Sequence, residues 1–563
     1  MDQRGWRWTD AHFCSLPSQL TLYGITSTPQ TNVYTHAKVI EPEGSNKLLV
    51  ASLTGKIVSV EYQRNGQKLK PSTKEVQFTY IPGDAELVSM DVAHRTSHQG
   101  TGLLIGITFL KQTQTEDGEH ACMQYLNLYS FSQSEEDSHY VDSVAQTCVT
   151  LELDFMPYQL IHTECVREGG LETVFLLSGN DHKVHMYRED HVAPVLRFKE
   201  EEIGDFFPEL CSPGSSVHWM DIVYVDNHKK RLTAQGLQTG QVFFSLVDVH
   251  TTEVLQGWEK VFDSPITCVK IFNPDNQVPF PEFLENIEGK DNSVAEESPV
   301  VYNLVVMSSL EPTVVYRNIL TNGLDNALYL PGSCCYDIPL CACVADIDFD
   351  GHNEILVGTY GQELLAYKLM QEDDQIPVVK KPPSLTKNKM SSPANINSYN
   401  MTEPIQSPRQ RHLTGSGHTG RDTQGDMKLP RKAKSQENLS SSLTNTQDSV
   451  LRGELPEVDL QEPVGDKKLC YKLLWQRSFA SPVVGVDRVD IMGDGMDDMV
   501  VVTLRGVHVI QPELSEVAQV CLERLRDLAV SRQKGQDEDE EQIQLNIDNQ
   551  LTSKISSAET SIT

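Results

Sequence analysis

The chain has 563 residues, a hydrophobic fraction of 39% and a formal net charge of −32. Its length allows several domains, although large all-β folds run longer as single units. Because so acidic a chain repels the phosphates of nucleic acids and of anionic lipids, we expect no nucleic-acid partner. No run of about 18 apolar residues occurs, and the start MDQRGWRWTDAHF lacks a signal-peptide core, so we expect a cytoplasmic protein without membrane insertion.

A hairpin pattern recurs along the sequence. Each copy has an apolar run, a polar turn that often holds glycine, and a second run with alternating apolar residues, which is typical of two antiparallel strands. The clearest copies are LLVASLTGKIVSVEY (48–62), TVFLLSGNDHKVHMY (173–187), ILVGTYGQELLAYK (355–368) and MVVVTLRGVHVI (499–510).

A further alternating segment precedes each hairpin, and seven such segments are present. They are NVYTHAKV (32–39), ELVSMDVA (86–93), YQLIHTEC (158–165), SVHWMDIVY (216–224), ITCVKIF (266–272), LCACVADI (340–347) and VVGVDRVD (483–490). A ring of such sheets buries their faces and leaves only short edges. The repeat therefore predicts an all-β, seven-bladed β-propeller of the FG-GAP or WD40 kind, with six or eight blades as alternatives.

The propeller is expected to be interrupted once and closed by its own N-terminal part. Residues 371–467 are rich in Ser, Thr, Asn, Gln, Pro and Lys and poor in aromatics, which predicts a disordered insertion. The segment LTLYGITSTPQ at 20–30 is expected to add a closing strand to the last blade. The predicted divisions are an N-terminal segment (1–19), six blades with the closing strand (20–370), the insertion (371–467) and the last blade (468–511).

The C-terminal part changes from strand to helix periodicity. Within 512–534, apolar residues recur at helical spacing, and Pro512 suits a first helical turn. These residues are Leu514, Val517, Ala518, Cys521, Leu525 and Leu528. The amphipathic helix either packs against the propeller or binds a partner, and both interpretations stay open. Residues 535–563 contain DEDEE and are expected to form a disordered acidic tail.

Alternating acids follow the sixth inner segment. Asp346, Asp348, Asp350 and Glu354 occupy positions 1, 3, 5 and 9 of the pattern D-x-D-x-D-G-x-x-E, which could give Ca²⁺ a weak site. The pattern resembles the calcium loops of FG-GAP repeats in integrin α-subunits. A second version begins at Asp490 but lacks the acid at position 3. In the alternative interpretation, the aspartates cap tight turns through hydrogen bonds from backbone N–H groups.

Signatures of catalysis are weak, and we expect a protein that is not an enzyme. The sequence has neither a phosphate-binding G-x-x-x-x-G-K-[ST] loop nor H-E-x-x-H, and GSGHTG at 415–420 lies in the expected insertion. A hydrolase with a metal held by the acidic loop is the remaining enzymatic alternative. Ser407, in SPRQR, and Ser435, after RKAK, are candidate phosphorylation sites in the insertion.

Long, non-repetitive blocks of this sequence resemble the kaptin family. They are VQFTYIPGDAELVSMD (76–91), TVFLLSGND (173–181), SLEPTVVYRNILTNGLDNALYLPGS (309–333), GTYGQELLAYK (358–368), LLWQRSFASP (473–482) and LRGVHVIQ (504–511). The resemblance runs in order from about residue 20 to 530. The N-terminal segment, the loop at 274–299 and the insertion depart from the family pattern.

The resemblance implies a function that the composition does not show. Kaptin-like proteins are subunits of KICSTOR, a scaffold at the lysosomal surface in which kaptin pairs with an FG-GAP-type propeller protein and with larger subunits. That scaffold recruits the GATOR complex and restrains mTOR signalling when amino acids or glucose are scarce. The family is also associated with filamentous actin at cell edges and in stereocilia, which is the alternative function. The resemblance carries no catalytic residues to this chain.

Overall fold

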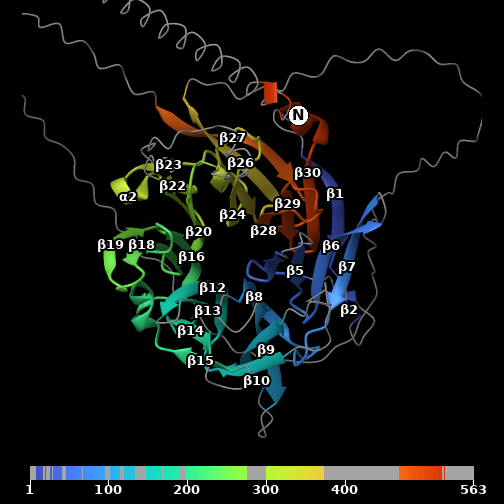
Figure 1. Cartoon of the computed structure of the whole chain (residues 1–563), viewed down its shortest axis with the longest axis vertical. Coiled ribbons are helices and arrows are strands. Elements are labelled where there is room, and N and C mark those ends of the chain that lie inside the picture. The colour runs from blue at the N-terminus through green and yellow to red at the C-terminus, as the bar shows by residue number, and fades with distance from the viewer. Residues whose placement is uncertain are drawn as a thin grey trace, which may run out of the picture. The chain divides into compact units, whose positions relative to one another are not determined.

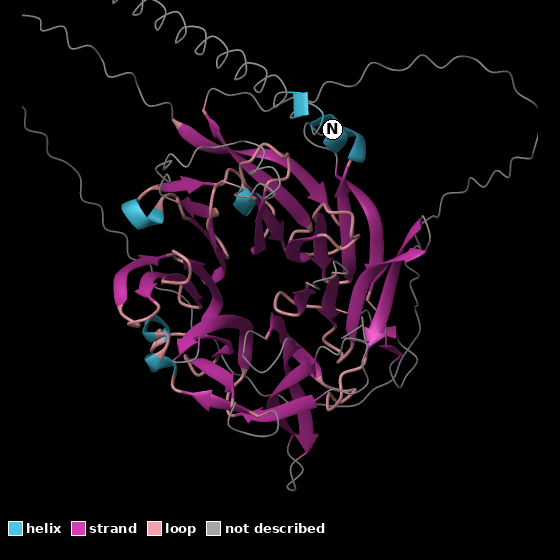
Figure 2. Ribbon diagram, viewed as in Figure 1, coloured by secondary structure: helices cyan, strands magenta, loops and turns pink. Residues whose placement is uncertain are grey.

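The structure, a computed structural model, describes residues 8–16, 19–20, 26–27, 30–40, 46–65, 68–95, 102–114, 120–132, 147–167, 170–190, 197–275, 300–372, 468–520, 522 and 525–526. In this part of the chain, seven four-stranded antiparallel sheets lie around a central axis (Figure 1). Nearly all of its regular secondary structure is strand, and the helical turns are short (Figure 2). The all-β, seven-bladed propeller predicted from the repeats is confirmed.

The first four blades follow one another along the chain, each with its first strand nearest the axis. Blade one has β4 (His36–Val39), β5 (Lys47–Ala51), β6 (Ile57–Asn65) and β7 (Lys68–Val76). Blade two has β8 (Glu86–His94), β9 (Gly102–Gln114), β10 (His120–Ser132) and β11 (Thr147–Leu153). Blade three has β12 (Pro157–Arg167), β13 (Gly170–Gly179), β14 (Val184–Glu189) and β15 (Phe198–Glu201). Blade four has β16 (Val217–Val225), β17 (Lys230–Leu237), β18 (Gln241–Asp248) and β19 (Val254–Val261).

The last three blades depart twice from a continuous run of four strands, because a long segment separates β26 from β27 in blade six and the N-terminal β1 completes blade seven. Blade five has β20 (Ile266–Phe272), β21 (Asn303–Ser308), β22 (Val314–Tyr316) and β23 (Ala327–Tyr329), and blade six has β24 (Pro339–Ala345), β25 (Glu354–Thr359), β26 (Glu363–Gln371) and β27 (Leu469–Ser478). Blade seven has β28 (Val483–Val489), β29 (Asp498–Thr503), β30 (Gly506–Pro512) and β1 (Trp8–Ser15). The described helical turns are η2 (Ile203–Asp205), η3 (Pro208–Leu210), α2 (Ile319–Asn322) and η4 (Ser333–Cys335).

The core is divided among the contacts between blades. The described residues form seven buried apolar clusters, each shared by two neighbouring blades. In β5, Leu48 and Val50 belong to the cluster shared with blade seven, whereas Leu49 and Ala51 belong to the cluster shared with blade two. Since successive side chains of a strand point to opposite faces, a strand buried on both faces is apolar throughout. This explains the continuous apolar runs of the hairpin repeat.

The closing strand is β1, and the prediction that residues 20–30 provide it is wrong. β1 pairs antiparallel with β30 from Trp8–Pro512 to Ser15–Gly506. Within 20–30 the structure describes a two-residue pairing between β2 (Gln19–Leu20) and β3 (Thr26–Ser27). β1 is longer than β2 and β3, and its Trp8 and Cys14 are buried in the two clusters that blade seven shares with its neighbours. The propeller therefore begins within the segment that was assigned to 1–19.

The insertion interrupts the chain between the third and fourth strands of blade six rather than between blades six and seven. β27 pairs with β26 as the fourth strand of blade six, so the prediction that 468–511 is the last blade alone is wrong. The predicted disorder of 371–467 concerns residues 373–467, which lie outside the described residues, so it stays a prediction. Beyond blade seven, residues 514–520 are helical, with Val517 buried and Leu514 exposed. Among the described residues, no helix combines the length and the apolar character that crossing a membrane requires.

Candidate functional site

The acidic loop joins β24 to β25 in blade six, and its own carboxylates hold the turn. Asp346 accepts hydrogen bonds from the backbone N–H groups of Asp350, at 3.1 Å, and Gly351, at 2.9 Å. Gly351 has a φ of +91°, a conformation that glycine adopts without strain. Glu354 Oε2 accepts the N–H of Ile347 at 2.9 Å. These are the turn-capping bonds that the alternative interpretation of the motif predicted.

A lysine from β26 lies at the centre of the acidic loop. Lys368 Nζ lies 2.5 Å from Asp348 Oδ2, 2.7 Å from Asp350 Oδ2 and 2.9 Å from Glu354 Oε1. Oxygens of Asp346, Asp348 and Glu354 lie within 4.8 Å of one another. The structure thus brings the four predicted residues together, around an ammonium group that the sequence motif does not contain.

Burial raises the pKa values of the carboxyl groups in this cluster, whereas Lys368 lowers them. Burial raises the pKa of Glu354 to about 8 and also raises the pKa of Asp348. At Asp350 burial acts the same way, but hydrogen bonds from Lys368 and from the N–H of His352 outweigh it and lower the pKa. The neighbouring carboxylates, Glu354 first, raise the pKa of Lys368 despite its burial. The ammonium is therefore held in its charged form.

The second loop, between β28 and β29 of blade seven, has a similar turn held by backbone hydrogen bonds to an aspartate, but different side chains inside it. Asp490 accepts the N–H groups of residues 493, 494 and 495 at 2.7–3.1 Å, and Asp498 accepts that of Met492 at 3.2 Å. Met492 stands at motif position 3. Gln511 corresponds to Lys368, because β30 pairs with β29 as β26 pairs with β25. Burial raises the pKa of Asp498 to about 7. The loop keeps its turn without an acid at motif position 3 and without a lysine.

The other predicted site residues, Ser407 and Ser435, lie outside the described residues. Both stay candidate phosphorylation sites.

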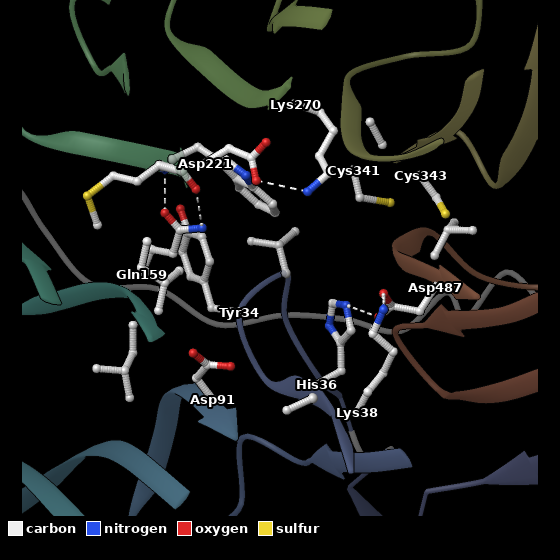
Figure 3. Close-up of a pocket in the computed structure, with 18 of the residues that line it drawn as sticks. Tyr34, His36, Lys38, Asp91, Gln159, Asp221, Lys270, Cys341, Cys343 and Asp487 are labelled. Carbon is white, nitrogen blue, oxygen red and sulfur yellow. Dashed lines mark hydrogen bonds and ion pairs between the residues drawn. The ribbon is translucent and has the colours of Figure 1, made fainter. Parts of the chain in front are cut away.

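A polar cavity of about 420 Å³ lies on the propeller axis, and the sequence analysis did not predict it (Figure 3). The first strands of all seven blades, together with the residues just before β4, line it with charged, aromatic and thiol side chains, among them Tyr34, Trp219 and Cys343. Gln159 Oε1 accepts a hydrogen bond from the backbone N–H of Met220 at 2.5 Å, and Gln159 Nε2 donates one to the carbonyl oxygen of the same residue at 3.3 Å. These contacts join blades three and four across the cavity wall.

Three aspartates occupy equivalent positions on the first strands of their blades, and each contacts a basic side chain of the next blade around this cavity. Each lies on the first strand of its blade, opposite residue 106, 234 or 500 of the second strand. Their carboxylates accept hydrogen bonds or form ion pairs with basic side chains of the following blade. The pairs are Asp91 with His162 Nδ1 at 2.7 Å, Asp221 with Lys270 at 2.8 Å, and Asp487 with Lys38 at 3.1 Å.

These ion pairs leave the cavity polar but largely neutralised. Asp221 raises the pKa of Lys270, and Asp487 raises the pKa of Lys38. Burial lowers the pKa of His36, which lies 3.5 Å from Asp487. The cavity is thus lined by charges that pair across the boundaries between blades.

Three comparisons place the chain among known proteins. A family described as "KICSTOR complex protein kaptin" matches residues 8–390 and 460–522. The mouse (Mus musculus) KICSTOR complex protein kaptin is 34% identical over 508 residues, which cover 90% of this chain and 91% of the relative.

The matching solved structures are much less similar in sequence. Sqt1 of Chaetomium thermophilum, bound to the N-terminus of ribosomal protein L10, has a TM-score of 0.34 and 11% identity over 59% of this chain and 71% of that chain. The Dos1 propeller has a TM-score of 0.34 and 8% identity over 62% of this chain and 69% of that chain. The assignment therefore depends on the sequence match, which extends through the propeller and both its ends. The chain belongs to the kaptin family of KICSTOR complex proteins.

Proposed function

We propose that this chain is a non-catalytic scaffold subunit of a KICSTOR-like complex, which recruits the GATOR complex to lysosomes and restrains mTOR signalling when amino acids or glucose are scarce. Membership of the kaptin family over 90% of the chain carries this proposal. The proposed partners are an FG-GAP-type propeller protein and the larger KICSTOR subunits. A propeller supports such a role because it presents wide faces and several outer edges to different partners.

The charge arrangement of the described residues supports the absence of catalysis. Lys368 engages the acids of blade six, and the cavity acids engage basic groups of neighbouring blades. In this proposal these charged groups hold the blades and the acidic loop in place. Turnover of a substrate by the purified chain would contradict this part of the proposal.

The experiment that tests the function is deletion and re-expression in cultured cells. Cells that lack the chain should keep an mTOR substrate phosphorylated during amino-acid or glucose withdrawal, and GATOR should leave a lysosomal marker. Re-expression of the chain should restore both responses. Normal GATOR localisation and normal mTOR inhibition without the chain would overturn the proposal.

The C-terminal helix is the proposed contact for a partner subunit. Its described part exposes Leu514, Leu522 and Leu525, which are 59%, 53% and 62% accessible. Exposed apolar side chains that are repeated on one helix are typical of helix-mediated docking. Leu522→Asp combined with Leu525→Asp should reduce co-purification of KICSTOR subunits, whereas Leu310→Asp, at another exposed leucine, should not. Unchanged assembly after deletion of 512–534 would exclude the helix as the contact.

Binding to filamentous actin is the alternative function, and we rank it second. Both actin and this chain are acidic, so their encounter is disfavoured unless a local basic or apolar surface compensates. Co-sedimentation with filaments, with and without 371–467, distinguishes direct binding from association through other proteins.

A further inference from the structure

We propose that the ammonium group of Lys368 is the structural cation of the acidic loop, and that it takes the place of a divalent metal ion. The loop would then need no Ca²⁺ in the native protein, and removal of the lysine charge would convert it into a site for one. This inference is independent of the proposed function.

The contacts of the ammonium match those of a central cation. An ammonium group has three N–H donors, and Nζ lies 2.5–2.9 Å from one oxygen of each of Asp348, Asp350 and Glu354. These acids stand at motif positions 3, 5 and 9, where a calcium loop would supply oxygens to the ion. The side chains of Lys368, Asp348 and Glu354 are 11%, 8% and 0% exposed. A buried carboxylate needs a compensating charge, and the lysine supplies it.

The same geometry does not fit a divalent ion beside the lysine. Ca²⁺ takes six to eight oxygens at about 2.3–2.6 Å. Both oxygens of Asp346 accept backbone N–H groups, and Glu354 Oε2 accepts the N–H of Ile347. An ion bound to the remaining oxygens would lie next to a like charge, and the low local dielectric would strengthen their repulsion. In this proposal, the ammonium group of Lys368 occupies the place that the calcium interpretation gives to Ca²⁺.

The second loop of the same protein provides an internal comparison. It has Met492 in place of the acid at position 3 and Gln511 in place of the lysine. Gln511 Nε2 lies 2.7 Å from Met492 Sδ, so the two substituted side chains contact each other. The carboxylate at motif position 3 and the lysine are thus present together in blade six and absent together in blade seven. This is the pattern expected if the lysine serves to neutralise that carboxylate.

The test compares three full-length chains: the wild type, Lys368→Gln, and the double variant Asp348→Met with Lys368→Gln, which copies the second loop. Thermal unfolding is followed in EDTA, in Ca²⁺ and in Mg²⁺, and Ca²⁺ binding is measured by calorimetry. The wild type should neither bind Ca²⁺ nor change its Tm. Lys368→Gln should unfold at a lower temperature in EDTA and regain roughly 3 °C or more in Ca²⁺. The double variant should be more stable than Lys368→Gln in EDTA and should not respond to Ca²⁺.

Each outcome decides for or against the proposal. Binding of Ca²⁺ by the wild type, or a drop of its Tm in EDTA, overturns it. A folded Lys368→Gln variant that ignores Ca²⁺ also overturns it. If Lys368→Gln does not fold, the double variant decides: recovery of folding without Ca²⁺ supports the proposal, and failure to recover overturns it. Lys368→Arg, which keeps the charge, should remain insensitive to both EDTA and Ca²⁺.

Discussion

At the scale of single residues, buried charges in this propeller have specific partners. Arg231 of β17 donates to both carboxylate oxygens of Glu209 in η3, at 2.7 and 3.0 Å, and the two side chains are 2% and 1% exposed. The guanidinium also lies over the ring of Phe207, 4.3 Å from its centroid. The pair ties the connection after blade three to the second strand of blade four.

Removal of one partner of this ion pair should be strongly destabilising. Glu209→Gln leaves Arg231 as a buried charge without its carboxylate, and we expect a loss of about 3–5 kcal/mol in the free energy of unfolding. The measurement is urea unfolding of Glu209→Gln, Arg231→Met and the double variant. Additive losses would show that the two side chains do not act as a pair.

Glycines in the second strands let neighbouring blades approach. A Cβ at Gly358 would lie 2.5 Å from Cys341 Sγ and 2.6 Å from Val483 Cγ1 of blade seven. Gly358→Ala should therefore cost about 1–3 kcal/mol through overpacking, measured by urea unfolding. Gly257→Ala in β19, where nothing lies within 4 Å, is the matched control and should be close to neutral. Equal effects of the two substitutions would argue against tight packing at this blade junction.

At the scale of elements, the closing strand β1 depends on a few anchors. Trp8 is 8% exposed in the cluster between blades six and seven, and its indole N–H donates to the carbonyl of Ile347 at 3.3 Å. Arg477 of β27 pairs with Asp10 at 2.5 Å and donates to the carbonyl of Trp8 at 2.9 Å. The strand therefore closes the ring and also contacts blade six.

Trp8→Ala should weaken this closure. Loss of the buried indole is expected to cost about 3–5 kcal/mol and to lower the Tm of the whole propeller, because the ring unfolds from an open junction. Thr9→Ala, at the adjacent exposed position, is the control. A Tm unaffected by Trp8→Ala would mean that β1 is not needed for closure.

At the scale of the whole molecule, charge pairs join successive blades around the axis. They link blade two to three, four to five and seven to one. The same strand position thus supplies an ion pair at three of the junctions between blades, beside the buried apolar clusters. Of these contacts, the one between Asp91 and His162 should depend on pH in the neutral range.

The Asp91 carboxylate raises the pKa of His162, and Glu164 adds a smaller effect. The folded state therefore binds the proton more tightly than the unfolded state, so this stabilisation is complete below about pH 6.5 and is lost as pH rises through the raised pKa. Because His162 is 44% exposed, the contribution should stay below about 1 kcal/mol.

Urea unfolding of the wild type and of Asp91→Asn at several pH values measures this contribution. The difference in stability should be largest on the acidic side and shrink toward pH 9. His162→Gln is the control and should remove the pH dependence of that difference. A difference that is constant with pH would exclude the ion pair as its cause.

The sequence by itself determined the repeat and hence the class of fold. Alternation and continuous apolar runs require strands with one or two buried faces, and seven copies of the unit call for a closed ring. The four acids of the blade-six loop were also recognisable, because their spacing is local. Lys368 is not part of that motif, and it lies opposite Glu354 because β26 pairs with β25, with Ile355 opposite Tyr367.

Tertiary structure alone decided which segment closes the ring, which blade receives the strand after the insertion, and what the acidic loop contains. Residues 8–15 form the closing strand, and Trp8 and Cys14 of that strand pack into buried clusters whose other members are distant in the sequence. β27 begins almost one hundred residues after the end of β26, and a local sequence pattern does not indicate a strand pairing across such a separation. The charge at the centre of the loop likewise comes from a neighbouring strand, because a buried cation is selected by three-dimensional proximity to carboxylates and not by the motif that holds them.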